Sequence, residues 1–137
     1  MTNAVLGGLP KEEATYAVTY GDRSKTQLNG QNKYVIHFNN EELPKVREFW
    51  SITLYGMDHF FVENPINRYK IGSLTECLKF NADGSLDIYI QHEAPVGHES
   101  NWLPASEGDF YLMMRFYNGE KEILDRTYTI PPFKKVN

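Results

Sequence analysis

The chain has 137 residues, of which 41% are apolar and 23% are charged, and it carries a net charge of −4. This length predicts one domain over residues 1–137 that can bury a core of its own. The negative charge argues against a nucleic-acid partner bound through a basic surface, and no apolar run approaches the roughly 18 residues of a membrane span.

The single cysteine, Cys77, excludes an internal disulfide framework and argues against thiolate metal sites. The first ten residues lack the charged and apolar regions of a secretory signal. We therefore expect a soluble, cytoplasmic protein, because one thiol is compatible with a reducing compartment. No motif in the chain predicts a cofactor or a metal ion.

The N-terminal part of the chain predicts a short helix followed by a strand. Pro10 suits the first position of a helix that continues through residues 11–14, where two acidic side chains favour the helix dipole. Residues 15–20 are rich in residues that favour strands.

Four later segments show the two-residue alternation of strands that have one buried face. In three of these segments, we expect every second side chain to point into the core. The four segments are residues 34–38, 49–55, 85–91 and 110–117, and the expected core comprises Trp50, Ile52, Leu54, Leu86, Ile88, Ile90, Phe110, Leu112, Met114 and Phe116.

Turn residues divide the rest of the chain into short pieces. Residues 78–91 predict a β-hairpin around Asp83-Gly84, and Asn118-Gly119 predicts a second turn. Residues 127–130 predict a last strand, which two prolines end, and residues 93–109 predict a long loop. About seven or eight strands result, so the predicted fold is an all-β sandwich of jelly-roll-like topology.

Several motifs in this order resemble one known family, the domain of unknown function numbered 1214. The resemblance runs from about Gly8 to Val136. The motifs that carry it are Asn29-Gly30, Tyr34-Val35-Ile36-His37-Phe38, Leu43-Pro44, Phe49-Trp50-Ser51-Ile52-Thr53-Leu54-Tyr55, Asn64-Pro65, Arg68-Tyr69, Asn81-Ala82-Asp83-Gly84-Ser85-Leu86, Glu99-Ser100-Asn101-Trp102-Leu103-Pro104 and Arg115-Phe116-Tyr117.

The resemblance implies an all-β, jelly-roll-like fold and supplies no activity or catalytic residues. Typical members are longer bacterial proteins, in which this domain follows the domain of unknown function numbered 1254. We expect that partner domain to be absent here. We expect either that a function needing both domains is lost, or that self-association supplies the missing surface.

The side chains opposite the expected core are too aromatic for a merely solvated face. Tyrosine with arginine is typical of recognition surfaces, because rigid rings give contact area and polar tips give direction. Two interpretations stay open, namely an interface with a second subunit and a groove for a polar or sugar-like ligand. The residues on this side are Phe49, Thr53, Tyr55, Tyr89, Gln91, Tyr111, Met113, Arg115 and Tyr117.

Asn101 and Trp102 stand out within the long loop. We expect the indole N–H of Trp102 to find a carbonyl and so attach the loop to the sandwich, and Asn101 to cap a turn. Contact of either residue with a ligand is the secondary interpretation.

Two His-Glu pairs, His92-Glu93 and His98-Glu99, are the remaining candidates for chemistry. Imidazole and carboxylate can ligate metal or transfer protons, and paired carboxylates cleave glycosides. The spacing is poor for a metal, since neighbours in a strand point to opposite faces. The leading hypothesis is therefore a non-catalytic interaction or ligand-binding module, and the alternative is a hydrolase, perhaps glycan-directed, that uses these four residues.

Overall fold

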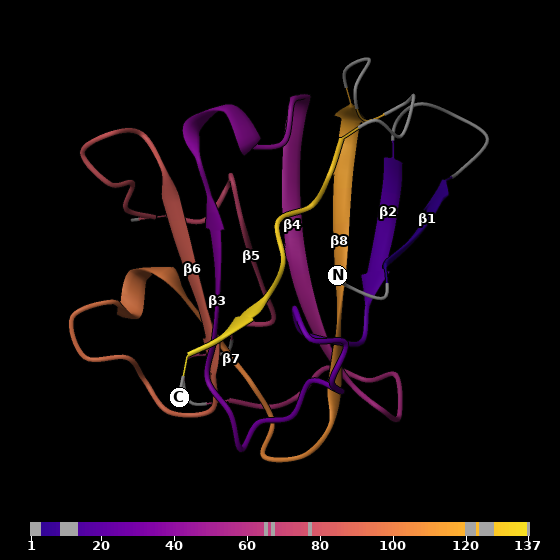
Figure 1. Ribbon diagram of the computed structural model, residues 1–137, viewed down its shortest axis with the longest axis vertical. Coiled ribbons are helices and arrows are strands. Elements are labelled where there is room, and N and C mark those ends of the chain that lie inside the picture. The colour runs from indigo at the N-terminus through magenta and orange to yellow at the C-terminus, as the bar shows by residue number, and fades with distance from the viewer. Residues whose placement is uncertain are drawn as a thin grey trace.

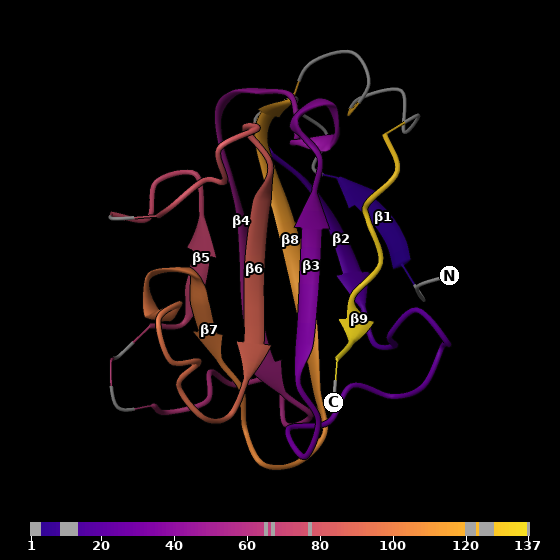
Figure 2. The same cartoon turned by 60° about the vertical axis from the view of Figure 1, so that its left-hand side comes forward.

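In a computed structural model, the described residues include nine strands, which form two sheets that face each other (Figures 1 and 2). Figure 2 shows β6 and β3 of one sheet in front of β4 and β8 of the other. No helix long and apolar enough to cross a membrane occurs in the described part of the chain. The structure describes residues 4–8, 14–64, 66, 68–76, 78–119, 123 and 128–136.

One sheet has five antiparallel strands in the order β1-β2-β8-β4-β5. The pairing of β4 with β8 is its longest, because these two strands run for 11 and 10 residues. The strands are β1 (Ala4–Gly8), β2 (Ala14–Thr19), β4 (Val46–Gly56), β5 (Lys70–Gly72) and β8 (Phe110–Gly119).

The second sheet has four strands in the order β7-β6-β3-β9. The pair β6–β7 is parallel, whereas β3 pairs antiparallel with β6 and β9. Two 3-10 turns, η1 (Asn40–Glu42) and η2 (Glu99–Asn101), lie in the connections. The strands are β3 (Tyr34–Phe38), β6 (Leu86–Gln91), β7 (Trp102–Pro104) and β9 (Lys134–Lys135).

The core fills the space between the sheets, and alternation in the sequence predicts its composition correctly. All ten expected core side chains are buried, with Ile52, Ile88 and Ile90 at 0% exposure. Each large apolar side chain buried in this way contributes about 1.5–3 kcal/mol. The all-β prediction is confirmed, and the two sheets form a sandwich, whereas the jelly-roll topology stays a prediction.

The structure corrects several local predictions. Asn118-Gly119 forms no turn, because β8 continues through Gly119. The long loop predicted at residues 93–109 contains η2 and β7. Residues 78–80 form no ladder, so the predicted hairpin has one strand only, although Gly84 does adopt a φ of +86° in its turn. Residues 128–130 form no strand either, and the last strand, β9, follows the two prolines. The strand β1 was not predicted. The predicted helix after Pro10 lies outside the described residues.

The C-terminal segment closes the side of the sandwich (yellow in Figures 1 and 2). The hydroxyl of Tyr128 donates a 2.6 Å hydrogen bond to the carbonyl of Glu42, and Phe133 is buried in the core. The Tyr128 hydrogen bond attaches the start of this segment to η1, and Phe133 attaches its later part to the core.

Candidate functional site

The outer face of the five-stranded sheet carries the aromatic residues that alternation placed opposite the core. Register pairs Phe49 with Tyr117 and Tyr55 with Tyr111 across β4 and β8. Phe49 and Tyr117 stack with ring centroids 4.2 Å apart. Directly opposite residues in an antiparallel pair share one face, so both ring pairs lie on the outer face of this sheet.

Five rings form an aromatic row across this face. Consecutive centroids in the row are 5.2–5.3 Å apart, within the 4.5–7 Å that favours aromatic pairs. The second ring of the row, Tyr111, is only 6% exposed although it lies on the outer face. Burial raises the pKa of its hydroxyl, and nearby Tyr20 adds to the shift. The aromatic row consists of Tyr20, Tyr111, Tyr55, Phe61 and Tyr69.

A tight turn after β4 places Phe61 in the row. The amide of Gly56 donates to the carbonyl of Phe60, and His59 occupies a φ of +71° between them. Asp58 Oδ1 accepts the amide of Phe60 at 3.1 Å. The turn reverses the chain, so that Phe61 forms an isolated antiparallel β-bridge with Tyr55.

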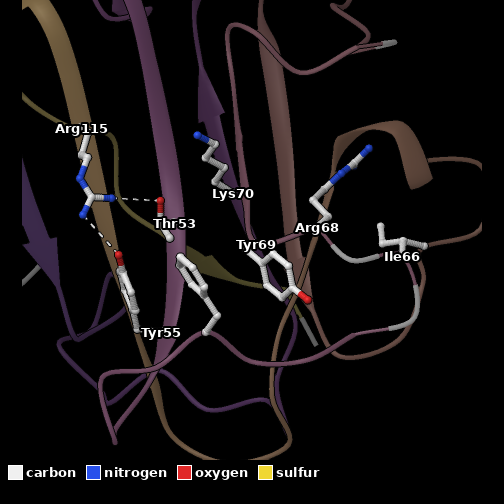
Figure 3. Close-up of a pocket in the computed structure, with 8 residues that line it drawn as sticks. Thr53, Tyr55, Ile66, Arg68, Tyr69, Lys70 and Arg115 are labelled. Atoms are coloured by element: carbon white, nitrogen blue, oxygen red, sulfur yellow. Dashed lines mark hydrogen bonds between the residues drawn. The ribbon is translucent and has the colours of Figure 1, made fainter.

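Arg115 lies beside the row and is held by two neutral hydroxyl groups. Its Nη1 donates to Oγ1 of Thr53 at 3.3 Å, and its Nη2 donates to the hydroxyl of Tyr55 at 3.2 Å. The side chain is half-buried. These bonds fix the plane of the guanidinium against β4 (Figure 3).

A hollow of about 600 Å³ opens next to Arg115 on the same face (Figure 3). We call it the sheet-face hollow. It combines three rings with three cationic side chains, and none of the described residues that line it is acidic. The lining residues are Thr53, Tyr55, Phe61, Ile66, Arg68, Tyr69, Lys70 and Arg115.

Arg68 separates this hollow from a second one. Its Nη1 donates to the carbonyls of Glu99, Ser100 and Trp102 at 2.9–3.2 Å, so the guanidinium attaches η2 to the segment before β5. The side-chain amide of Asn64 brackets Arg68 by bonding its backbone N–H and C=O. Arg68 is therefore mainly a structural anchor.

The second hollow, which we call the loop hollow, has a volume of about 770 Å³ and receives three of the four predicted His/Glu residues. His92, Glu93 and Glu99 line it. His98 does not, because its ring stacks on Tyr89 with centroids 4.6 Å apart. Among the described residues, no three His, Cys, Asp or Glu side chains are grouped to hold a metal ion.

His92 is oriented by the backbone. Its Nδ1 lies 2.9 Å from the carbonyl of Ala105, and because a carbonyl only accepts, Nδ1 carries the proton. Its Nε2 is 4.0 Å from the Glu107 carboxylate. No hydrogen bond links His92 to Glu93 or Glu99 in the described structure. These residues therefore form no acid/base pair that would support the hydrolase alternative.

The grouping of Tyr89 with Tyr111 and Arg115 on one surface is wrong. Tyr89 belongs to β6, which lies in the four-stranded sheet, and its outer face is on the opposite side of the sandwich. Burial raises the pKa of the Tyr89 hydroxyl. Alternation shows which side of a strand a residue occupies, but not to which sheet the strand belongs.

Asn101 and Trp102 attach the long loop to the sandwich. The indole Nε1 of Trp102 donates to the carbonyl of Gln91 at 2.8 Å, as predicted. Asn101 is buried and bonds the backbone of Lys79 and Asp87 instead of capping a turn. Both residues thus have structural partners, and only Trp102 reaches a hollow.

Five residues of the sheet-face hollow were not predicted as site residues, namely Phe61, Ile66, Arg68, Tyr69 and Lys70. Phe61 follows an irregular turn, and β5 has only three residues, too few for alternation to be visible. The available signal was the adjacent pair Tyr69-Lys70, which combines an aromatic residue with a cation. Arg115 and Tyr117 form a similar combination two residues apart.

The fold and the site define a β-sandwich with one hollowed, aromatic outer face. The chain belongs to the family described as protein of unknown function DUF1214, whose model matches residues 13–121. The resemblance seen in the motifs is thereby confirmed. No match is found among curated proteins.

Two solved structures are similar to this chain. The VPA0106 protein from Vibrio parahaemolyticus is 36% identical with a TM-score of 0.83, and the match covers 95% of this chain and 32% of that one. An uncharacterized protein from Burkholderia cenocepacia is 14% identical with a TM-score of 0.54, over 96% of this chain and 34% of that one. The second likeness concerns the fold alone, and the chain spans about a third of each.

Proposed function

We propose that this chain is a non-catalytic ligand-binding module that holds a small polar, sugar-like molecule on the outer face of its five-stranded sheet. The observation that carries the proposal is the sheet-face hollow, in which three aromatic rings stand beside Arg115 and the Thr53 hydroxyl. Its volume of about 600 Å³ is within the range of about 300–1,000 Å³ typical of ligand pockets.

The combination of groups suits a molecule with one apolar and one polar side. Aromatic faces provide rigid contact area, while the guanidinium and hydroxyl groups provide direction. The rings are already stacked and Arg115 is already bonded, so little side-chain freedom is lost on binding. Such preorganisation favours binding of a small ligand.

The test is an NMR titration of the isotope-labelled chain with galactose and with galacturonate. We expect at least one sugar to shift the amide signals around Thr53 and Phe61. The Phe61→Ala variant should weaken that binding about tenfold, since it removes a ring that is stacked and still half exposed.

Phe80→Ala is the matched control, because Phe80 is 52% exposed, against 54% for Phe61, and does not line the hollow. It should bind like the unmodified chain. The proposal fails if neither sugar shifts these signals, or if Phe61→Ala binds as tightly as Phe80→Ala.

Self-association is the competing use of the same face. Phe60 is 71% exposed at its rim, and exposed apolar side chains of this kind favour contact with a second copy. Light scattering measures this directly. A dimer that Phe60→Ser converts to monomers, together with no sugar binding, would assign the face to an interface.

A further inference from the structure

The sheet-face hollow is cationic in a chain whose overall charge is −4. We propose that its ligand is an acidic sugar, whose carboxylate lies over Thr53 between Arg115 and Lys70. This inference rests on the function proposed above and adds the charge of the ligand and the position of its anionic group.

Strand register brings the two cations to either side of Thr53. Lys70 on β5 is the direct partner of Thr53 on β4, and Arg115 on β8 is the direct partner of Ser51. All four residues therefore share the outer face. The backbones of β8 and β5 are two strand spacings apart, about 10 Å, so long cationic side chains from both can reach one group above β4.

In the part of the chain that the structure describes, no carboxylate forms an ion pair with either cation. Arg115 bonds only hydroxyl groups among the residues described, and the two ion pairs found between described side chains both belong to histidines, His37 and His92. Lys70 is exposed and extends beside Thr53 (Figure 3). A guanidinium that is fixed in plane and not paired with a carboxylate suits an incoming oxyanion.

Arg68 takes no part in this anion site. Its Nη1 is bonded to three carbonyls of the η2 region, and Figure 3 shows the side chain extending away from Arg115. The anion position is thus defined by two cations rather than three. This makes Lys70, whose side chain forms no hydrogen bond or ion pair with a described residue, the informative residue to change.

The aromatic row supplies the surface for the rest of the sugar. The Tyr55 hydroxyl accepts from Arg115, and the Tyr55 ring stacks on Phe61, so the anion position and the apolar surface are adjacent. A sugar acid has the same two parts, an oxyanion and the apolar face of a ring. A neutral sugar would provide no anionic group to pair with either cation.

The experiment compares galacturonate, galactose and inorganic sulfate in NMR titrations of the whole chain. We expect galacturonate to bind about tenfold more tightly than galactose, which lacks the charge. Sulfate alone should bind more weakly than galacturonate, because it makes no contact with the rings. The advantage of galacturonate should fall at about 1 M salt, where the Debye length is about 3 Å.

Lys70→Gln should weaken galacturonate binding about tenfold and leave galactose binding unchanged. Lys135→Gln is the control, since Lys135 is equally exposed and lies on the other sheet. Equal binding of the two sugars, with no effect of Lys70→Gln, overturns the acidic-sugar inference and leaves the proposed function standing. Sulfate binding as tightly as galacturonate, or no binding of any probe, overturns both.

Discussion

His37 on β3 and Asp87 on β6 are directly opposite each other, and the imidazole Nδ1 lies 2.6 Å from the carboxylate Oδ1. The pair is on the outer face of the four-stranded sheet, on the side of the sandwich away from the sheet-face hollow. The hydrogen bond to Asp87 raises the pKa of His37 above its ordinary value of 6.5, and Asn39 adds to the shift. This contact gives the fold a dependence on pH.

The stability that His37 provides should be present below pH 6.5 and lost as pH rises through its higher folded-state pKa. The pair is exposed, so the effect is at most about 1 kcal/mol. We expect the difference in free energy of unfolding between the unmodified chain and His37→Gln to shrink across this range. Urea unfolding at several pH values measures it, and a constant difference would contradict the assignment.

Asn101→Ala should be strongly destabilising. The Asn101 amide donates to the carbonyls of Lys79 and Asp87 and accepts the amide of Lys79, all at 2.8–2.9 Å. Losing these bonds in a buried place should cost about 2–3 kcal/mol in free energy of unfolding. Exposed Asn40→Ala is the control and should change it by less than about 0.5 kcal/mol.

The Ile88→Ala variant tests whether this side chain is packed in the core between the two sheets. Ile88 has no exposed surface, so removing its outer carbons leaves a cavity between the sheets and should cost about 2–5 kcal/mol. Val96→Ala removes carbons from a side chain that is 92% exposed, and its unfolding midpoint should be unchanged. Similar midpoints for both variants in chemical denaturation would refute the burial of Ile88.

Gly72→Ala should displace β5 from the sheet. A Cβ at Gly72 would lie 2.1 Å from the carbonyl oxygen of Trp50, a contact that only movement of the backbone can relieve. We expect faster hydrogen exchange of the β4–β5 amides. Because Lys70 is on the same strand, galacturonate binding should also weaken. Gly108→Ala has open space around its Cβ and serves as the control.

Sequence reasoning predicted the inner layer well because burial on one side of a strand leaves a two-residue pattern. Ile88, Leu112 and Met114 were all placed correctly in the core. The attachment of Trp102 was predictable as well, since a buried indole N–H needs an acceptor.

The site was predicted only in part, for two physical reasons. Which strands share a sheet depends on non-local pairing, so Tyr89 was assigned to the wrong surface. Phe61 and Lys70 reach the hollow from a turn and a three-residue strand, whose positions are set by contacts with β4 rather than by local preference. Arg115 and Tyr55, which line the hollow, were expected on the outer face because long strands carry them.

The order of strands determines when the parts of the sheet-face hollow are synthesised and paired. Thr53 and Lys70 lie before β6 in the chain and Arg115 lies after β7, yet all three are neighbours in one sheet. In a chain emerging from the ribosome, Thr53 and Lys70 are therefore present before Arg115 has been synthesised. Pairings between such distant segments form slowly, so capture of a ligand would report that the last long strand has been inserted.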